Sequence, residues 1–149
     1  MADAVTEIYK SHRDAQEKYI YFLLAAAGAG IALIVNQTHD SKLAWSMIPL
    51  GLSVLCWGLS FVLGCRYLDY VRSILYANHD LLRVEAGIHP MAGNHPEAIA
   101  VASEGIRMAV EKNSDRAAVL ARLQFRFLVA GALLFIVWHV VEMYLRAVK

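Results

Sequence analysis

The chain has 149 residues, of which 58% are hydrophobic and 18% are charged, and its formal net charge is +1. Ordinary soluble domains are less apolar than this, at about 45–50%. A net charge near zero also argues against a strongly basic nucleic-acid-binding protein, so no nucleic-acid partner is expected.

Three apolar stretches are long enough to cross a bilayer as helices. The hydrocarbon core is about 30 Å thick and each helical residue adds about 1.5 Å, so about 20 residues are needed. The predicted spans cover residues 19–36, 43–65 and 125–146. These lengths predict an integral membrane protein whose first partner is the lipid bilayer.

Helical periodicity continues outside the spans. Residues 1–18 are predicted to form an amphipathic helix that precedes the first span. The second span is predicted to run on as one long helix until Gly87 and the His89-Pro90 step stop it.

A second cytoplasmic helix is predicted after that loop. Pro96 and Glu97 suit its first turn, with Asn94 as its N-cap. The run Asn113-Ser114-Asp115 is expected to break this helix, after which the last helix would begin and enter the membrane.

These elements together predict the fold class. We expect an all-α integral membrane helical bundle with three transmembrane helices and a helical cytoplasmic extension. Residues 1–149 would form a single domain, with a cytoplasmic helical hairpin over about residues 66–124.

The distribution of lysine and arginine predicts the orientation. Eleven of these residues flank or separate the spans on one side: Lys10, Arg13, Lys18, Arg66, Arg72, Arg83, Arg107, Lys112, Arg116, Arg122 and Arg126. Lys42, Arg146 and Lys149 lie on the other side. The positive-inside rule therefore predicts a cytoplasmic N-terminus and an outside C-terminus, and we expect a bacterial inner membrane.

Small residues in the first span give the clearest functional signal. Ala25 pairs with Ala29, and Ala26 pairs with Gly30, at the four-residue spacing through which membrane helices approach closely. Because more than one such face is present, we predict that this span forms the seam of a homo-oligomer.

The third span carries a pair of ionisable side chains. His139 and Glu142 are three residues apart and share one face of the helix. A proton-relay or pore-lining pair is one interpretation, because ionisable groups at membrane depth are costly to keep. A pair at headgroup level, with Glu142 bound to Arg146 one turn further, is the interpretation that we prefer.

Arg72 and His79 offer an alternative on the cytoplasmic helix. An arginine followed by four to six residues and a histidine resembles the loose signature of helical ribonucleases that build their site on dimerisation. The resemblance would imply RNA cleavage by a paired Arg72/His79 face. A solvated helix face explains the same two residues, and it is preferred.

No catalytic set, metal site or cofactor site is predicted. The spans lack the second histidine of a bis-His haem site, and the two cysteines, Cys56 and Cys65, fall on different faces of one helix. We expect a homo-oligomeric helical assembly. Such an assembly can form a pore or channel, with a cytoplasmic collar that gates it or binds a protein partner. The alternative is a membrane-bound enzyme or redox subunit that uses His139/Glu142 or Arg72/His79.

Overall fold

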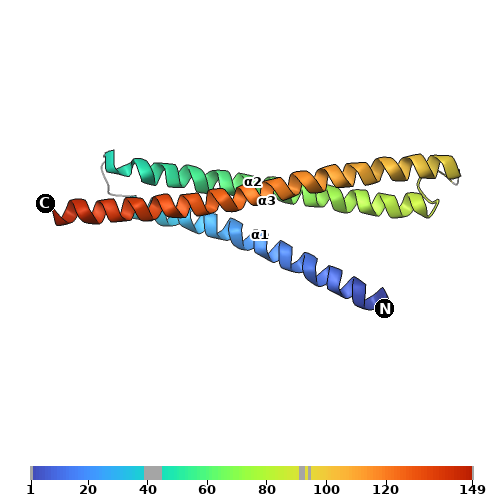
Figure 1. Cartoon of the computed structure of the whole chain (residues 1–149), viewed down its shortest axis with the longest axis horizontal. Coiled ribbons are helices and arrows are strands. Elements are labelled where there is room, and N and C mark those ends of the chain that lie inside the picture. The colour runs from blue at the N-terminus through green and yellow to red at the C-terminus, as the bar shows by residue number, and fades with distance from the viewer. Residues whose placement is uncertain (1, 39–44, 91–92, 94, 149) are drawn as a thin grey trace. The chain divides into compact units, whose positions relative to one another are not determined.

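The computed structural model describes residues 2–38, 45–90, 93 and 95–148. Within these ranges the chain is helical and contains no strand. The elements are α1 (Ala2–Thr38), the short 3-10 turn η1 (Trp45–Met47), α2 (Ile48–Glu85) and α3 (Pro96–Ala147) (Figure 1). The predicted all-α class is confirmed.

Three helical stretches of the described chain are long and apolar enough to cross a membrane. They are Asp14–Thr38 in α1, Trp45–Glu85, which combines η1 with α2, and Pro96–Ala147, which is α3. The amphipathic helix predicted over residues 1–18 is continuous with the first of them, because α1 begins at Ala2 and has no break.

The end of α2 is set by Gly87. Its φ of 69° is left-handed, a conformation that only glycine adopts without strain. The Gly87 N–H donates to Val84 O at 3.0 Å, and the Ile88 N–H donates to Arg83 O at 3.1 Å. This pair of bonds is a Schellman motif, which satisfies carbonyls of the last turn. The predicted continuation of this helix beyond residue 65 and its stop at Gly87 are confirmed.

α3 begins at Pro96, as predicted for a proline in the first helical position. The first bond of the helix runs from the Ile99 N–H to His95 O at 3.0 Å. The predicted N-cap, Asn94, lies outside the described residues.

The break predicted at residues 113–115 is wrong, because α3 continues without interruption to Ala147. Asn, Ser and Asp cost only a few tenths of a kcal/mol each in a helix, so packing overrides them. Asn113 Nδ2 donates to Ser73 Oγ at 3.4 Å, and Ala117 is buried one turn later.

Contacts divide the described chain into two compact units. The span unit holds α1, α2 as far as Gly64 and α3 from Arg122, and the hairpin unit holds Cys65–Ala121. The count of one domain stays a prediction.

The hairpin unit has a small core. Only Val84, Ser103 and Ala117 of its described side chains are buried. An ion pair joins its two helices at the surface, with Arg107 Nη2 at 2.7 Å from Glu85 Oε1. Exposed pairs of this kind contribute at most about 1 kcal/mol.

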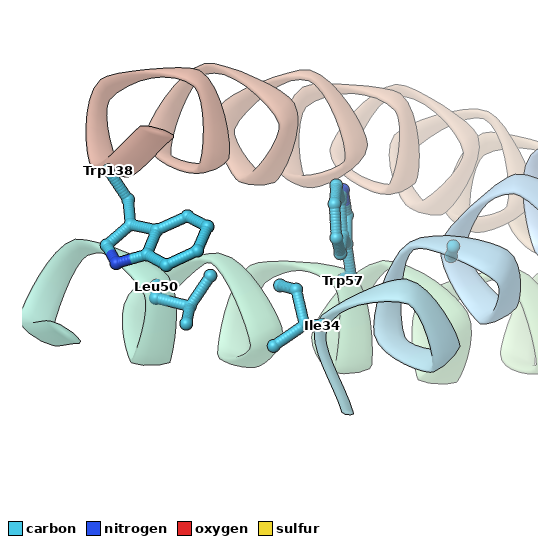
Figure 2. Close-up of a cluster of buried hydrophobic side chains, with 5 residues drawn as sticks. Ile34, Leu50, Trp57 and Trp138 are labelled. Carbon is cyan, nitrogen blue, oxygen red and sulfur yellow. The ribbon is translucent and has the colours of Figure 1, made fainter. Parts of the chain in front are cut away.

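The span unit has the main apolar core. A cluster of buried side chains joins α1, α2 and α3, and Figure 2 shows four of its members facing one another between the helices. The cluster consists of Ala27, Ile34, Leu50, Trp57 and Trp138. Partly buried residues packed against it are Ile31, Val54, Leu128, Ala132 and Phe135.

Trp57 is the central side chain of this cluster. A β-carbon built at Gly30 of α1 would lie 2.5 Å from the six-membered ring of Trp57, and one at Gly131 of α3 would lie 2.6 Å from the five-membered ring. The indole is therefore held between two helix backbones at positions where only glycine fits. Its Nε1–H donates to Leu128 O at 3.1 Å.

We predict opposite effects for alanine at two glycines of α1. Gly30→Ala should lower the free energy of unfolding by about 1–3 kcal/mol, because the new methyl group collides with Trp57. Gly28→Ala should raise it by about 0.5–1 kcal/mol, because alanine favours the helix and nothing lies within 4 Å of that position. Far-UV circular dichroism during unfolding in detergent measures both free energies. Equal changes in the two variants would contradict the placement of Trp57 against Gly30, which we call the Trp57 wedge.

Candidate functional site

Polar side chains of α2 form a ladder of hydrogen bonds to the backbone of α3 in the span unit. The donors recur at positions i, i+4 and i+7, so they lie on one face of α2. The bonds are Ser53 Oγ to Gly131 O (2.7 Å), Trp57 Nε1 to Leu128 O (3.1 Å) and Ser60 Oγ to Gln124 O (2.9 Å). As the donors advance along α2 the acceptors retreat along α3, so the two helices are antiparallel in this unit.

Gln124 extends the ladder toward Gly64, but its own side chain is unsatisfied. The side chain is fully buried, and neither Nε2 nor Oε1 has a hydrogen-bond partner among the described residues. A β-carbon built at Gly64 would lie 2.5 Å from Gln124 Nε2 and 2.7 Å from Leu24 Cδ2. Gly64 therefore makes room for a carboxamide whose burial costs about 1–3 kcal/mol without a partner.

The glycines of the spans fall into two groups. Gly30, Gly64 and Gly131 are filled by side chains of the same chain, as described above. Built β-carbons at Gly28, Gly51 and Gly58 meet nothing within 4 Å. Nothing within the described chain therefore requires glycine at these three positions.

The residues of the predicted seam are divided between two surfaces of α1. Ala25 and Ala29 are exposed, whereas Ala26 is half-buried and Gly30 contacts Trp57. At Gly30, the Ala26/Gly30 face therefore packs against Trp57 of the same chain. A larger side chain at Gly30 would disturb the fold of one copy, so it cannot serve as a test of contact between copies.

His139 and Glu142 lie together at one end of the span unit. Both line a cavity of about 250 Å³, whose other lining residues are Gln37, Trp138, Met143 and Arg146. Arg146 Nε donates to Glu142 Oε1 at 3.3 Å, the i, i+4 contact that the headgroup-level interpretation predicts.

The His139 ring continues a row of aromatic contacts from the core. Its centroid lies 6.5 Å from that of Phe135, with the ring planes 19° apart, and 6.3 Å from that of Trp138. The histidine is nevertheless exposed. It therefore packs as the last member of an aromatic row that starts at Trp57.

Arg72 and His79 both lie on exposed positions of α2 in the hairpin unit. His79 Nδ1 lies 3.8 Å from its neighbour Asp80. A cavity of about 380 Å³ in this unit does not include either residue in its lining, which consists of Arg66, Asp69, Tyr70, Ser73, Asn113 and Leu120. The ribonuclease-like interpretation gains no support from this placement.

Neither a metal-binding group in the described part of the chain nor a related protein points to a function. Among the described residues, no group of three His, Cys, Asp or Glu side chains is placed to hold a metal ion. No family model, no curated protein and no solved structure matches the chain.

The ladder was not predicted from the sequence. Ser53, Ser60 and Gln124 are uncharged, so they do not stand out within the apolar stretches that mark the predicted spans. The spacing of seven residues between the two serines, with Trp57 between them, was the available signal. It marks one polar face on α2, but it does not identify the partner helix.

We predict that Gln124→Met raises the free energy of unfolding by about 1–3 kcal/mol. Methionine keeps the unbranched shape and removes both unsatisfied atoms. The measurement is a denaturation midpoint in detergent. Ser60→Ala is the comparison, because it removes one satisfied bond and should lower stability by about 1 kcal/mol. A loss of stability in Gln124→Met would mean that the carboxamide has a partner beyond this chain.

Proposed function

We propose that the protein is an integral membrane protein with three spans that assembles with copies of itself. The main support comes from Gly28, Gly51 and Gly58, where a built β-carbon meets nothing within 4 Å. We call these three the open glycines. The cytoplasmic hairpin would surround the assembly as a collar that gates it or binds a protein partner.

Glycine inside a helix costs about 0.5–1 kcal/mol relative to alanine. Gly30, Gly64 and Gly131 repay this cost within the chain, because a side chain fills the space at each. The open glycines have no such contact. Close approach of a helix from another copy gives them a physical role, since membrane helices associate through small residues.

The exposed surface of α1 supports the same proposal. Ala25, Ala29 and Ala32 are exposed, and Gly28 lies between them on the same side of the helix. This small-residue surface offers lipid few contacts but lets a second helix approach. We call it the α1 seam.

The outer surface of α3 differs in character. Only 11% of its most apolar stretch is buried, and large side chains such as Leu133, Ile136 and Val140 are exposed there. Bulky aliphatic side chains of this kind suit contact with lipid chains. The contrast favours the small-residue side of α1 over the outer surface of α3 as the surface that meets another copy. On α2, bulky side chains such as Leu55 and Val62 are exposed as well.

A pore is one form that such an assembly can take. Ser53 and Ser60 donate inward to α3, and Gln124 is buried, so these polar groups are not available to a channel wall. A pore built at the α1 seam would be lined by small and apolar side chains, and such constrictions gate by dewetting.

The charge distribution supports an orientation with the N-terminus and the hairpin unit in the cytoplasm of a bacterial cell. Eleven of the 14 lysines and arginines lie on that side of the spans. The C-terminus would then lie outside the inner membrane.

We predict that Gly28→Leu, Ala29→Leu or Gly51→Leu weakens self-association at least about tenfold, the equivalent of roughly 1.4 kcal/mol of lost contact. Each leucine would separate two helix backbones. Native mass measurement in nanodiscs and crosslinking in membranes report the change.

Two controls separate assembly from folding. Val140→Leu adds bulk to the exposed surface of α3 and should leave the association constant unchanged. Gly131→Leu should reduce helicity and thermal stability, because it collides with Trp57. An unchanged oligomer distribution in all three leucine variants, the two in the α1 seam and Gly51→Leu in α2, would remove the proposed assembly surface.

The orientation has its own test. In a background with Cys56→Ala and Cys65→Ala, Thr38→Cys should react with an impermeant maleimide in intact cells, whereas Gly93→Cys should react only after lysis. The expectation follows from the positive-inside rule. The opposite labelling pattern would reverse the proposed orientation.

A further inference from the structure

The cavity at the end of the span unit combines hydrogen-bond donors with a carboxylate. Its volume of about 250 Å³ is several times the roughly 30 Å³ that one water occupies in the liquid. Gln37 near the end of α1 and the last turns of α3 line it. We call it the terminal cavity.

Trp138 lines this cavity and carries a buried N–H donor. The residue is 8% exposed, and its Nε1 has no hydrogen-bond partner among the described residues. Figure 2 shows the indole nitrogen on the side of the ring away from Trp57. Because a buried N–H is costly without an acceptor, this group indicates a missing acceptor.

Arg146 supplies further donors on the same lining. Its guanidinium has five N–H groups, and the described contact with Glu142 uses the one on Nε. The side chain is 78% exposed, so its remaining donors are accessible. Guanidinium groups match the geometry of phosphate oxygens, and Trp138 Nε1–H can add a further bond to the same group.

Glu142 adds a negative charge beside these donors. Its side chain is 29% exposed and its carboxylate has about four acceptor positions, so the contact with Arg146 leaves room for a cationic N–H donor. The lining therefore presents one anion and one cation side by side. The complementary ligand is a zwitterion with a phosphate and a primary ammonium.

Aromatic side chains mark the same end of the unit. Trp45 is 88% exposed and Tyr144 is 69% exposed, although both are large and amphipathic. Tryptophan and tyrosine gather where a membrane meets water. This places the terminal cavity at headgroup depth if the helices cross a bilayer.

We propose that the terminal cavity binds the phosphoethanolamine headgroup of a membrane lipid. The phosphate accepts from Trp138 Nε1 and from Arg146, and the ammonium donates to Glu142. The inference rests on the proposed membrane location but not on the proposed assembly. A choline headgroup fits less well, because its trimethylammonium has no N–H to donate.

The test is native mass spectrometry of the full chain in detergent, titrated with phosphatidylethanolamine, phosphatidylcholine and phosphatidylglycerol that carry the same acyl chains. The wild-type protein should retain phosphatidylethanolamine with about tenfold higher affinity than the other two. Equal retention of the three lipids would overturn the proposal.

Variants assign the contacts. Trp138→Phe removes the N–H and keeps a ring in the core, and Arg146→Gln changes an exposed side chain that cannot disturb folding greatly. Each should weaken phosphatidylethanolamine binding about tenfold. Glu142→Gln should abolish the preference over phosphatidylcholine. Arg126→Gln, an exposed arginine of α3 outside the cavity lining, is the matched control and should change nothing.

Free phosphoethanolamine and inorganic phosphate form a separate arm. Either should bind more weakly than the lipid, which also gains contacts from its acyl chains. Equal competition by inorganic phosphate would identify a free-anion site and overturn the lipid assignment. The same spectra report the oligomer distribution, so loss of the lipid preference is distinguishable from loss of assembly.

Discussion

The indole of Trp57 controls how closely the three helices of the span unit approach one another. It is flat enough to enter between two helix backbones, and it does so only where glycine removes the β-carbon on both sides. Its Nε1–H is satisfied by Leu128 O, so the ring brings no unpaired donor into the apolar core. The remaining core contacts, from Ile34 to Trp138, form around this wedge (Figure 2).

The position of Trp57 also explains why some of the span positions need glycine and others do not. A glycine in a helix can make room for a side chain of its own chain or leave a surface open to a neighbour, and both cases occur here at different positions. Where Trp57 or Gln124 fills the space, the glycine serves the fold of one copy. Where nothing approaches, as at Gly51, the glycine stays available to a neighbour.

The sequence predicted the parts of the structure that depend on local rules. Helical periodicity and length located the three long helices, and the left-handed preference of glycine located the end of α2 at Gly87. The contact between Glu142 and Arg146 followed from their spacing on one helix. The predicted break at residues 113–115 was wrong because weak helix propensity yields to packing.

Pairing between helices was beyond reach of the sequence, since periodicity identifies a face but not its partner. Gly30 therefore looked like part of a surface between copies, although it contacts Trp57 of the same chain. The unsatisfied groups on Gln124 and Trp138 were hidden for the same reason. A side chain reveals a missing partner only when its surroundings are known.

The ladder between α2 and α3 has a consequence for how this chain tolerates change. Its acceptors are carbonyls in the interior of α3, and each carbonyl oxygen has two lone pairs, one of which the helix already uses. Loss of a serine donor leaves no carbonyl without a bond. Each substitution of alanine for Ser53 or Ser60 therefore lowers stability only slightly. The interface between α2 and α3 can lose its polar side chains one at a time while the chain stays folded.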